Sequence, residues 1–375
     1  MNPRERVLRT INFKEPDRVP IDFGGTIVTS ITRKAYSDLV KYFNWRDLDK
    51  PETMEICQDI VIPAEQIKEF FGADLRRVAL RTPSSWKLVI DADDSFINEW
   101  GIKFKRFGHY YDIVEFPIKE PSVEILEKYP WPDPTDRARY AGLEEEAKAL
   151  HDAGNYAVIA DMFTAGVFFH AMRMRGFEQF MGDLAMRPQF AIALMEKLVE
   201  IYEKFYKYYL EAVGKYIDIV AVADDLGTQT GPMLSPRMYR EMIKPLHKRL
   251  YSYIKNRTNA KLLMHSDGAI EPLIGDLIDV GVDILDPIQT SAQDMVPSAL
   301  KKKYGSKIVF YGAIDVQTVL SQGTPEDVEN EVYRMIDALG QGGGYVLGAT
   351  HNIQPDCPPA NVVKMYRSAK NQYKR

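Results

Sequence analysis

Cysteine is nearly absent from this sequence, whose 375 residues include only Cys57 and Cys357. Two cysteines so far apart provide no close pair for a zinc ribbon or a redox centre. A chain of this length also has little need of disulfides, because it can bury a sizeable core. Neither thiol has basic neighbours in the sequence, so we expect both to be unreactive core residues.

Long apolar runs and a surplus of positive charge are missing as well. No stretch approaches the roughly 20 apolar residues that cross a bilayer, and the opening MNPRERVLRT lacks the apolar segment of a signal peptide. The net charge is −5, from 48 Lys and Arg against 53 Asp and Glu, which argues against a surface that follows nucleic-acid phosphates. We therefore expect a cytoplasmic protein that binds neither membranes nor nucleic acids.

What the sequence does contain is enough apolar material for a large core, with 45% hydrophobic residues and no low-complexity tract or internal repeat. Short segments rich in β-branched and apolar residues recur along it, and most are separated by stretches with helical periodicity. There are eight such segments, at residues 18–23, 75–80, 156–162, 218–225, 261–267, 282–288, 307–315 and 344–350. Apolar strands that alternate with helices predict a parallel sheet covered on both faces. Eight units predict an α/β fold, the (β/α)8 TIM barrel, as a single domain over residues 1–375.

The helices are clearest late in the chain. Residues 235–256 begin with a Ser235 cap and have an apolar stripe, and residues 324–340 begin with Thr324 as cap and Pro325 at the first helical position. Residues 86–118 break this rhythm, because apolar and polar residues alternate there between turn signals. We predict an antiparallel hairpin region at this point, within an insertion over residues 82–135 after the second strand.

Polar side chains follow the predicted strands, at the end where α/β barrels hold their sites. His265 and Asp267 are two residues apart, so their side chains leave the same face if the strand stays extended, and His351 follows the last strand. Two imidazoles and a carboxylate form a recognised metal set, with zinc as the first candidate. Taken singly, each histidine is more often a hydrogen-bonded core or pocket residue. The metal hypothesis also requires side chains of two separated strands to meet across the barrel mouth.

Asp224 and Asp225 form a carboxylate pair at the end of the fourth predicted strand, directly after IVAVA. If they lie close together, repulsion or burial would raise the pKa of one of them and make it a general acid at neutral pH. The alternative is that one only caps the following loop, and we expect one structural and one functional residue. Further polar residues near strand ends are predicted to contact a substrate. They are Asp161, Gln229, Gln289 and Asp315.

Two other patterns have less specific interpretations. An aromatic and methionine-rich run either lines a pocket or packs under a helix, and packing is the commoner role. Its members are Met162, Phe163, Phe168, Phe169, His170 and Met172. The glycines of QGGGYVLG precede a predicted strand and do not open a helix, so they do not meet the requirement for a phosphate-binding loop.

Several segments resemble the uroporphyrinogen decarboxylase superfamily. They are RVLRTINFKEPDRVPI, RGFEQFMGDLAMRP, LSPRMYREMIKPLHKRL, HSDGAIEPLIGDLIDVGVDILDPIQ, YGAIDVQTVL and THNIQPDCPPANV, and together they cover nearly the whole chain. The resemblance implies a single (β/α)8 barrel with its site at the carboxyl face. True decarboxylases of this superfamily have an Arg-Gln-Ala-Gly-Arg motif after the first strand, whereas DFGGTIVTS here contains no arginine. A tetrapyrrole with many carboxylates would lack its main charge partners.

The other branch of the superfamily transfers methyl groups to or from a corrinoid, and this chain resembles it at HSDG and GATHN. That branch typically holds zinc with a His-x-Cys motif and a later cysteine, for which Asp267 and His351 stand here. Harder ligands favour a Lewis-acidic centre that polarises oxygen. We therefore hypothesise cleavage of a methyl ether, with aromatic ethers among the candidates, in which the metal or an Asp224/Asp225 acid assists the departing oxygen.

The chain contains no Asp-x-His-x-x-Gly motif for binding cobalamin, so we expect the corrinoid on a separate partner protein. Two alternatives stay open. One is a decarboxylase or lyase that acts on a carboxylated substrate with Asp224 or His265 as proton donor, and the other is a ligand-binding barrel without catalysis. The sequence leaves monomer and homodimer equally open.

Overall fold

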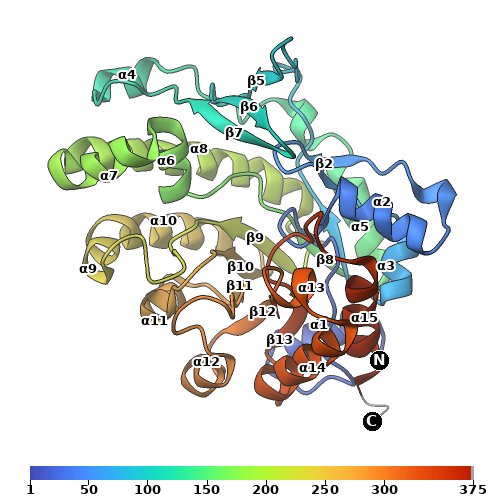
Figure 1. The fold of residues 1–375 in the computed structure, drawn as a ribbon. Helices are drawn as coiled ribbons and strands as arrows, with labels where there is room; N and C mark the ends of the chain where they lie inside the picture. Colours follow the sequence, from blue (N-terminus) through green and yellow to red (C-terminus); the bar gives the residue numbers. More distant parts are fainter. Residues whose placement is uncertain (373–375) are drawn as a thin grey trace.

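The computed structural model describes residues 1–372 and is built around a parallel sheet of seven strands (Figure 1). The strands are β4 (Leu75–Val78), β8 (Ala157–Ala160), β9 (Ile219–Ala223), β10 (Lys261–His265), β11 (Ile284–Asp286), β12 (Val309–Ile314) and β13 (Tyr345–Ala349). They pair in the order β13-β12-β11-β10-β9-β8-β4, so each strand of this sheet after β4 lies beside the strand of the same sheet that precedes it in the chain. This order, with helices in the connections, confirms the predicted TIM-barrel-like α/β fold.

The first predicted strand, residues 18–23, is reduced to one bridge between Ile21 and Leu347 of β13. The N–H of Leu347 donates to the Pro20 carbonyl over 2.8 Å, and the N–H of Asp22 donates to the Leu347 carbonyl over 2.9 Å. On the other side, the N–H of Asp74, just before β4, donates to the Ile21 carbonyl over 2.8 Å. Pro20 has no N–H with which to extend the ladder. The barrel therefore consists of seven strands and a short closing segment, and the prediction of eight strands was wrong by this one.

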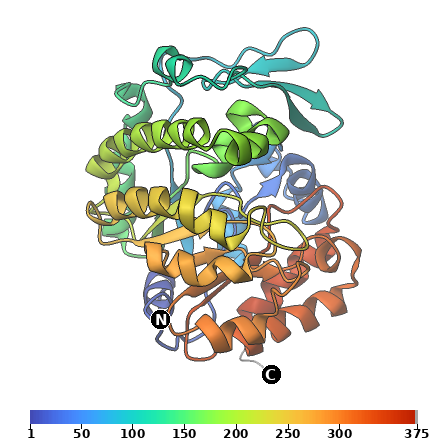
Figure 2. The same cartoon turned by 90° about the vertical axis from the view of Figure 1, so that its left-hand side faces the viewer.

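Helices surround the sheet on its outer side, except that α1 closes one end of the barrel (Figures 1 and 2). They are α1 (Pro3–Thr10), α2 (Arg33–Tyr42), α3 (Glu65–Phe71), α5 (Leu143–Ala153), α6 (Phe168–Arg175), α7 (Phe177–Met186), α8 (Pro188–Val213), α9 (Pro236–Met238), α10 (Lys244–Lys255), α11 (Glu271–Val280), α12 (Pro297–Tyr304), α13 (Val319–Gln322), α14 (Pro325–Met335) and α15 (Pro359–Lys370). Short 3-10 turns lie at Arg46–Leu48 and Arg137–Tyr140. Val7 and Ile11, at the C-terminal end of α1, pack with strand residues such as Leu263 in a core cluster inside the barrel. Because α1 closes the interior in this way, the site must lie at the other end of the strands.

The two helices that the sequence predicts most clearly begin where their caps lie. The hydroxyl of Ser235 accepts a hydrogen bond from the N–H of Met238, and Thr324 forms a capping box with Asp327. Both helices include a π-helical turn, at Tyr239–Ile243 and at Ile336–Gly340. The caps satisfy N–H groups that have no partner within the first helical turn, which is why local sequence locates these helix starts well.

Two small antiparallel sheets lie outside the barrel. One has the order β1-β3-β2, with β1 at Ile31–Thr32, β2 at Thr53–Glu55 and β3 at Ile60–Val61. The other lies in the chain between β4 and β8 and has the order β5-β6-β7, with β5 at Ser95–Ile97, β6 at Lys103–Phe107 and β7 at Tyr110–Glu115. After it comes the short helix α4 (Val123–Lys128). Figure 2 shows this sheet on the far side of α6–α8 from the barrel strands, and its residues Phe96, Phe104 and Tyr111 belong to the main core cluster.

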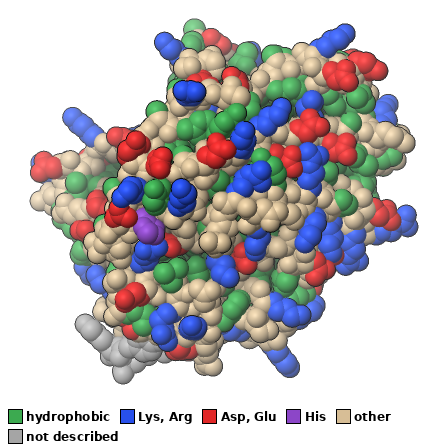
Figure 3. All heavy atoms as spheres, turned by 180° about the vertical axis from the view of Figure 1, so that it is seen from behind, with side chains coloured by type: hydrophobic (Ala, Val, Ile, Leu, Met, Phe, Trp, Pro, Cys, Tyr) green, Lys and Arg blue, Asp and Glu red, His purple; other side chains and the backbone are tan. Residues whose placement is uncertain are grey.

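The outer surface mixes both signs of charge. Figure 3 shows one face on which Lys and Arg side chains alternate with Asp and Glu side chains, without a large area of a single sign. No helix within residues 1–372 is both long enough and apolar enough to cross a bilayer.

Candidate metal and substrate site

A cavity of about 1260 Å³ opens at the carboxyl ends of the barrel strands. Its floor includes residues at or just after strand ends, namely Met162, Ala223, His265, Val316 and Thr350. Its walls come from the outer elements, with Phe104 and Tyr110 from the β5-β6-β7 sheet and Phe169 from α6. The segment between β4 and β8 thus forms one wall of the barrel mouth, and the cavity stays open to solvent.

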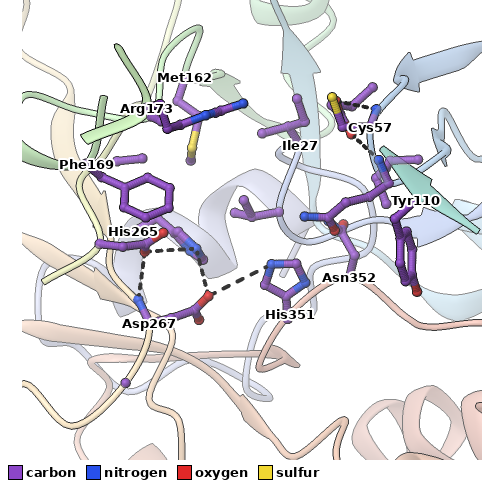
Figure 4. Close-up of a pocket in the computed structure, with 18 of the residues that line it drawn as sticks. Ile27, Cys57, Tyr110, Met162, Phe169, Arg173, His265, Asp267, His351 and Asn352 are labelled. Carbon is purple, nitrogen blue, oxygen red and sulfur yellow. Dashed lines mark hydrogen bonds and ion pairs between the residues drawn. The ribbon is translucent and has the colours of Figure 1, made fainter. Parts of the chain in front are cut away.

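His265, Asp267 and His351 converge on one part of this cavity (Figure 4), and their ligand atoms all lie within 4.8 Å of one another. The Nε2 atom of His265 is 3.7 Å from Oδ2 of Asp267, and Nε2 of His351 is 3.9 Å from the same oxygen. Strand β10 ends at His265, so the loop and not an extended strand turns Asp267 toward the histidine. The side chains of two separated strands do meet across the barrel mouth.

These three side chains fit a divalent metal. Zinc ligands about 2.1 Å from the ion in a tetrahedron are about 3.4 Å apart, so the observed separations require only small side-chain movements. The Nδ1 atom of His265 lies 2.8 Å from Oδ2 of buried Asp286, which is the usual way in which a carboxylate orients a metal-binding histidine. This contact leaves Nε2 of His265 for the cavity. Two nitrogens and one oxygen leave further coordination positions for an exogenous ligand.

The charges of the three residues depend on one another. Burial alone would lower the pKa of His265, but the carboxylates of Asp267 and Asp286 outweigh burial and hold this pKa well above its ordinary value. Burial lowers the pKa of His351. Burial opposes ionisation of Asp267, but His265 and His351 overcome this effect and lower its pKa. The site therefore holds an ionised carboxylate between one charged and one neutral imidazole, and metal binding would displace a proton from His265.

Asp225 lines the same cavity, and its Oδ1 atom lies 4.0 Å from Nε2 of His265. Burial, together with the nearby Asp267, raises the pKa of Asp225 to about 6. The same oxygen accepts a hydrogen bond from the backbone N–H of Asp267 over 3.1 Å. Asp225 is thus both a titratable group facing the cavity and a support for the loop that places Asp267.

Glycines at Gly227 and Gly268 allow the two loops that hold these acids to touch. Gly268 has φ +90, a conformation that side chains rarely adopt, and a Cβ there would lie 2.6 Å from the carbonyl carbon of Gly227. The N–H of Gly268 donates to Oε1 of Gln289 over 2.8 Å, and Nε2 of Gln289 donates to Oε1 of Gln229 over 3.0 Å. Gln229 and Gln289 both line the cavity, as do Asp225 and the three candidate metal ligands.

Three other acids that the sequence suggests for the site point elsewhere. Asp224, expected as a candidate acid, accepts hydrogen bonds from the N–H groups of residues 167–169 and contacts Nε2 of His247 over 2.8 Å. Asp161 is ion-paired with Arg77, and Asp315 accepts hydrogen bonds from the backbone and hydroxyl of Thr318. All three carboxylates are buried and none lines the cavity. Their hydrogen bonds and ion pairs go to other groups of the chain, which favours a supporting role over contact with a ligand.

The aromatic run divides in the same way. Met162, Phe163, Phe169 and Met172 line the cavity, whereas Phe168 and His170 are buried, with Nδ1 of His170 2.6 Å from the hydroxyl of Tyr202. The expectation for the two cysteines was correct for buried Cys357 but wrong for Cys57, which is half-buried on the cavity wall. Burial raises the pKa of Cys57, so its thiol stays protonated and unreactive.

Two residues of the site were not singled out from the sequence. Asp286 lies at the carboxyl end of a predicted strand and is one of the polar residues found there, but nothing in the sequence pairs it with His265. Arg173 lines the cavity from α6, and no local pattern distinguishes it from Arg175 nearby. Only the packing of distant segments reveals the surroundings of these two side chains.

Comparisons with known proteins give a consistent picture. The family model described as uroporphyrinogen decarboxylase (URO-D) matches residues 110–372. The uroporphyrinogen decarboxylase of Pseudoalteromonas translucida (strain TAC 125) is 30% identical over 139 residues, which are 35% of this chain and 36% of that protein. The uroporphyrinogen decarboxylase of Oceanobacillus iheyensis is 26% identical over 189 residues, which are 50% of this chain and 50% of that protein. The chain therefore spans no more than half the length of either relative. A solved methyltransferase from Methanosarcina mazei shares the fold with a TM-score of 0.70 and 16% identity, over 100% of this chain and 99% of that one.

Proposed function

The chain belongs to the uroporphyrinogen decarboxylase (URO-D) family, and from this premise we propose that it is a methyltransferase which takes a methyl group from a methoxylated, aromatic substrate and passes it to a corrinoid on a partner protein. The observation behind the proposal is the convergence of His265, Asp267 and His351 within 4.8 Å on the wall of a large cavity. The fold that this chain shares with the methyltransferase from Methanosarcina mazei is compatible with methyl transfer.

The cavity is a poor match for a substrate with many carboxylates. Among the described residues that line it, Arg173 is the only lysine or arginine, and the segment after Asp22 contributes the apolar side chains of Ile27 and Val28. Several carboxylates in this space would lack charge partners, which is costly at a partly buried site. The lining supports a smaller and more apolar substrate than a tetrapyrrole.

In the proposed reaction, His265, Asp267 and His351 would hold a divalent metal, with zinc as the first candidate. When bound, the metal would supply a Lewis acid for the ether oxygen, and the partner's corrinoid would supply the nucleophile that accepts the methyl group. As the bond between methyl carbon and oxygen breaks, both electrons of that bond stay on the oxygen. The Asp225 carboxyl group is placed to give its proton to this oxygen, which leaves as a hydroxyl group.

The other polar residues of the cavity keep this arrangement in place. Asp286 orients His265 through Nδ1, and Gln289 holds the N–H of Gly268 beside Asp267. Gln229 and Gln317 meet through a hydrogen bond of 2.9 Å at the cavity edge. Their amide groups are polar contacts for a substrate that carries oxygen atoms.

The test combines metal analysis with turnover. Purified protein is expected to hold one equivalent of divalent metal and to release the corresponding phenol from methoxylated benzoates when free cob(I)alamin is added. The double variant H265A/H351A should lose both the metal and the phenol release. Full activity of that variant without metal would end the metal hypothesis, and release of carbon dioxide without corrinoid would favour a decarboxylase instead.

A further inference from the structure

Arg173 is a cation without a partner on the wall of the candidate site. It forms no hydrogen bond or ion pair with any of residues 1–372, although its side chain is only partly exposed. Its nearest aromatic contact is Phe104, whose ring centre lies 5.5 Å from the guanidinium carbon. Figure 4 shows the side chain extending into the cavity, across from Asp267 and His351. A charged group placed in this way is available to a ligand.

The other arginines enclosed by the fold are treated differently. Each buried arginine pairs with a carboxylate of the chain, as Arg175 does with Asp183 over 2.8 Å. The others are Arg6 with Asp74, Arg76 with Glu65 and Arg139 with Glu99. Arg173 is two residues from Arg175 on the same helix, yet neither Glu55 nor Asp112, which also line the cavity, forms an ion pair with it. Within residues 1–372 no carboxylate pairs with Arg173, so its guanidinium group is free to pair with an anion from outside the chain.

The surroundings of Arg173 indicate the rest of the ligand. Phe169 precedes it by one turn of α6, and both side chains point into the cavity (Figure 4). In this view Phe169 lies between Arg173 and His265. Buried Met172 adds apolar lining beside Arg173, which is itself only partly exposed, so an ion pair formed there is stronger than one in bulk water. Guanidinium groups bind carboxylates through two parallel hydrogen bonds, a fit that lysine cannot reproduce.

We propose that Arg173 binds the carboxylate of the substrate, and that the substrate is a small aromatic carboxylic acid whose ring lies against Phe169. The proposal rests on the proposed function for the methyl ether at the other end of that substrate, which would face His265, Asp267 and His351. A single arginine provides one carboxylate-binding group and disfavours ligands with many carboxylates. The substrate is thus a methoxylated aromatic monoacid, and Arg173 is a specificity-determining residue for its carboxylate.

The test is a binding measurement that requires no turnover. By titration calorimetry, wild-type protein should bind 4-methoxybenzoate and 4-methylbenzoate, and it should bind the neutral ester methyl 4-methoxybenzoate much more weakly. The variant R173Q should weaken both acids by about 10- to 100-fold, the range expected for loss of a charged hydrogen-bonded contact, without changing the affinity for the ester. R173K should recover part of this loss. The matched control R237Q removes an exposed arginine on α9 and should bind all three compounds like the wild type.

Each outcome separates this inference from the proposed function. Unchanged binding of 4-methoxybenzoate by folded R173Q, or failure of the wild type to bind either acid at millimolar concentration, would overturn the carboxylate site. If 4-methylbenzoate binds through Arg173 but no methoxylated acid is demethylated, the carboxylate site stands and the methyltransferase proposal fails. If neutral ethers are demethylated as readily as acids and R173Q does not change the binding of acids, the methyltransferase proposal stands and the carboxylate site fails.

Discussion

The two ring nitrogens of His265 have different partners, and this difference decides what the residue can do. Nδ1 is held by Asp286, whereas Nε2 faces Asp267 and the cavity. A proton on Nδ1 then donates to the Asp286 carboxylate, so the neutral ring presents a lone pair at Nε2. The buried acid thus selects the tautomer that a metal ligand requires.

This arrangement predicts the effect of removing the orienting charge. D286N should weaken zinc binding by about 10- to 100-fold, the usual effect of losing such a partner, because the amide no longer fixes the tautomer. The measurement is competition with a chelator, followed by metal analysis. H151A, which removes a partly exposed histidine on α5, should retain the wild-type affinity. An affinity of D286N equal to that of the wild type would show that Asp286 has no part in metal binding.

At the scale of elements, the site depends on two loops that touch through backbone atoms. The loop after β9 contains Gly227, and the loop after β10 contains Gly268, whose N–H is held by Gln289. The N–H of Ala269 also donates to the carbonyl of Thr228 over 2.7 Å. Side chains larger than hydrogen cannot enter this contact, so the position of Asp267 is determined by packing around it.

A methyl group in this contact is expected to disturb the site. G268A would place Cβ 2.6 Å from the Gly227 carbonyl carbon and 2.7 Å from the Thr228 oxygen, at a φ that favours glycine. We expect a loss of roughly 1–3 kcal/mol in the free energy of unfolding, together with weaker metal binding. The control is G275A on α11, where an added Cβ meets no atom within 4 Å, and helix propensity should make it neutral or more stable by about 1 kcal/mol. Denaturant unfolding of both variants checks this, and equal stability of the two would contradict it.

The elements were easier to predict from the sequence than the direction of their side chains. Ser235 and Thr324 cap helices through contacts three residues away, so the local sequence is sufficient to locate those helix starts. Asp224 and Asp225 are neighbours, and only the tertiary structure determines that the first serves α6 and the second faces the cavity. Residues 18–23 have the composition of a strand, but pairing was limited by Pro20, which lacks an N–H.

At the scale of the whole molecule, buried acids link the stability of the fold to pH. Asp22 lies in the closing segment, is fully buried, and has one carboxyl oxygen without a hydrogen-bond partner in residues 1–372. Burial raises its pKa from 3.8 to about 6, and the nearby Asp286 adds to this effect. Between these values the folded protein keeps the proton while the unfolded chain releases it. The free energy of unfolding should therefore fall as the pH rises from about 4 to about 6.

The variant D22N should remove this dependence. A shift of about two pKa units corresponds to about 3 kcal/mol. This is the largest loss in the free energy of unfolding that we expect for the wild type above pH 6, and D22N should not show this loss. Urea unfolding at pH 4, 5, 6 and 7.5 measures the effect. As a control, D327N changes an exposed cap on α14 and should lower the stability by a similar amount at pH 5 and at pH 7.5. Parallel pH profiles of D22N and the wild type would show that Asp22 does not titrate in this way.

The bridge between Ile21 and Leu347 joins the closing segment, residues 18–23, to β13, the last strand of the sheet along the chain. During synthesis on the ribosome, residues 18–23 emerge long before β13 exists, so β4 and the strands after it assemble as an open sheet with an unpaired edge. Such edges are prone to pairing with other chains. A chain that lacks β13 therefore keeps an unpaired strand edge, and we expect it to aggregate more readily than the chain with β13 in place.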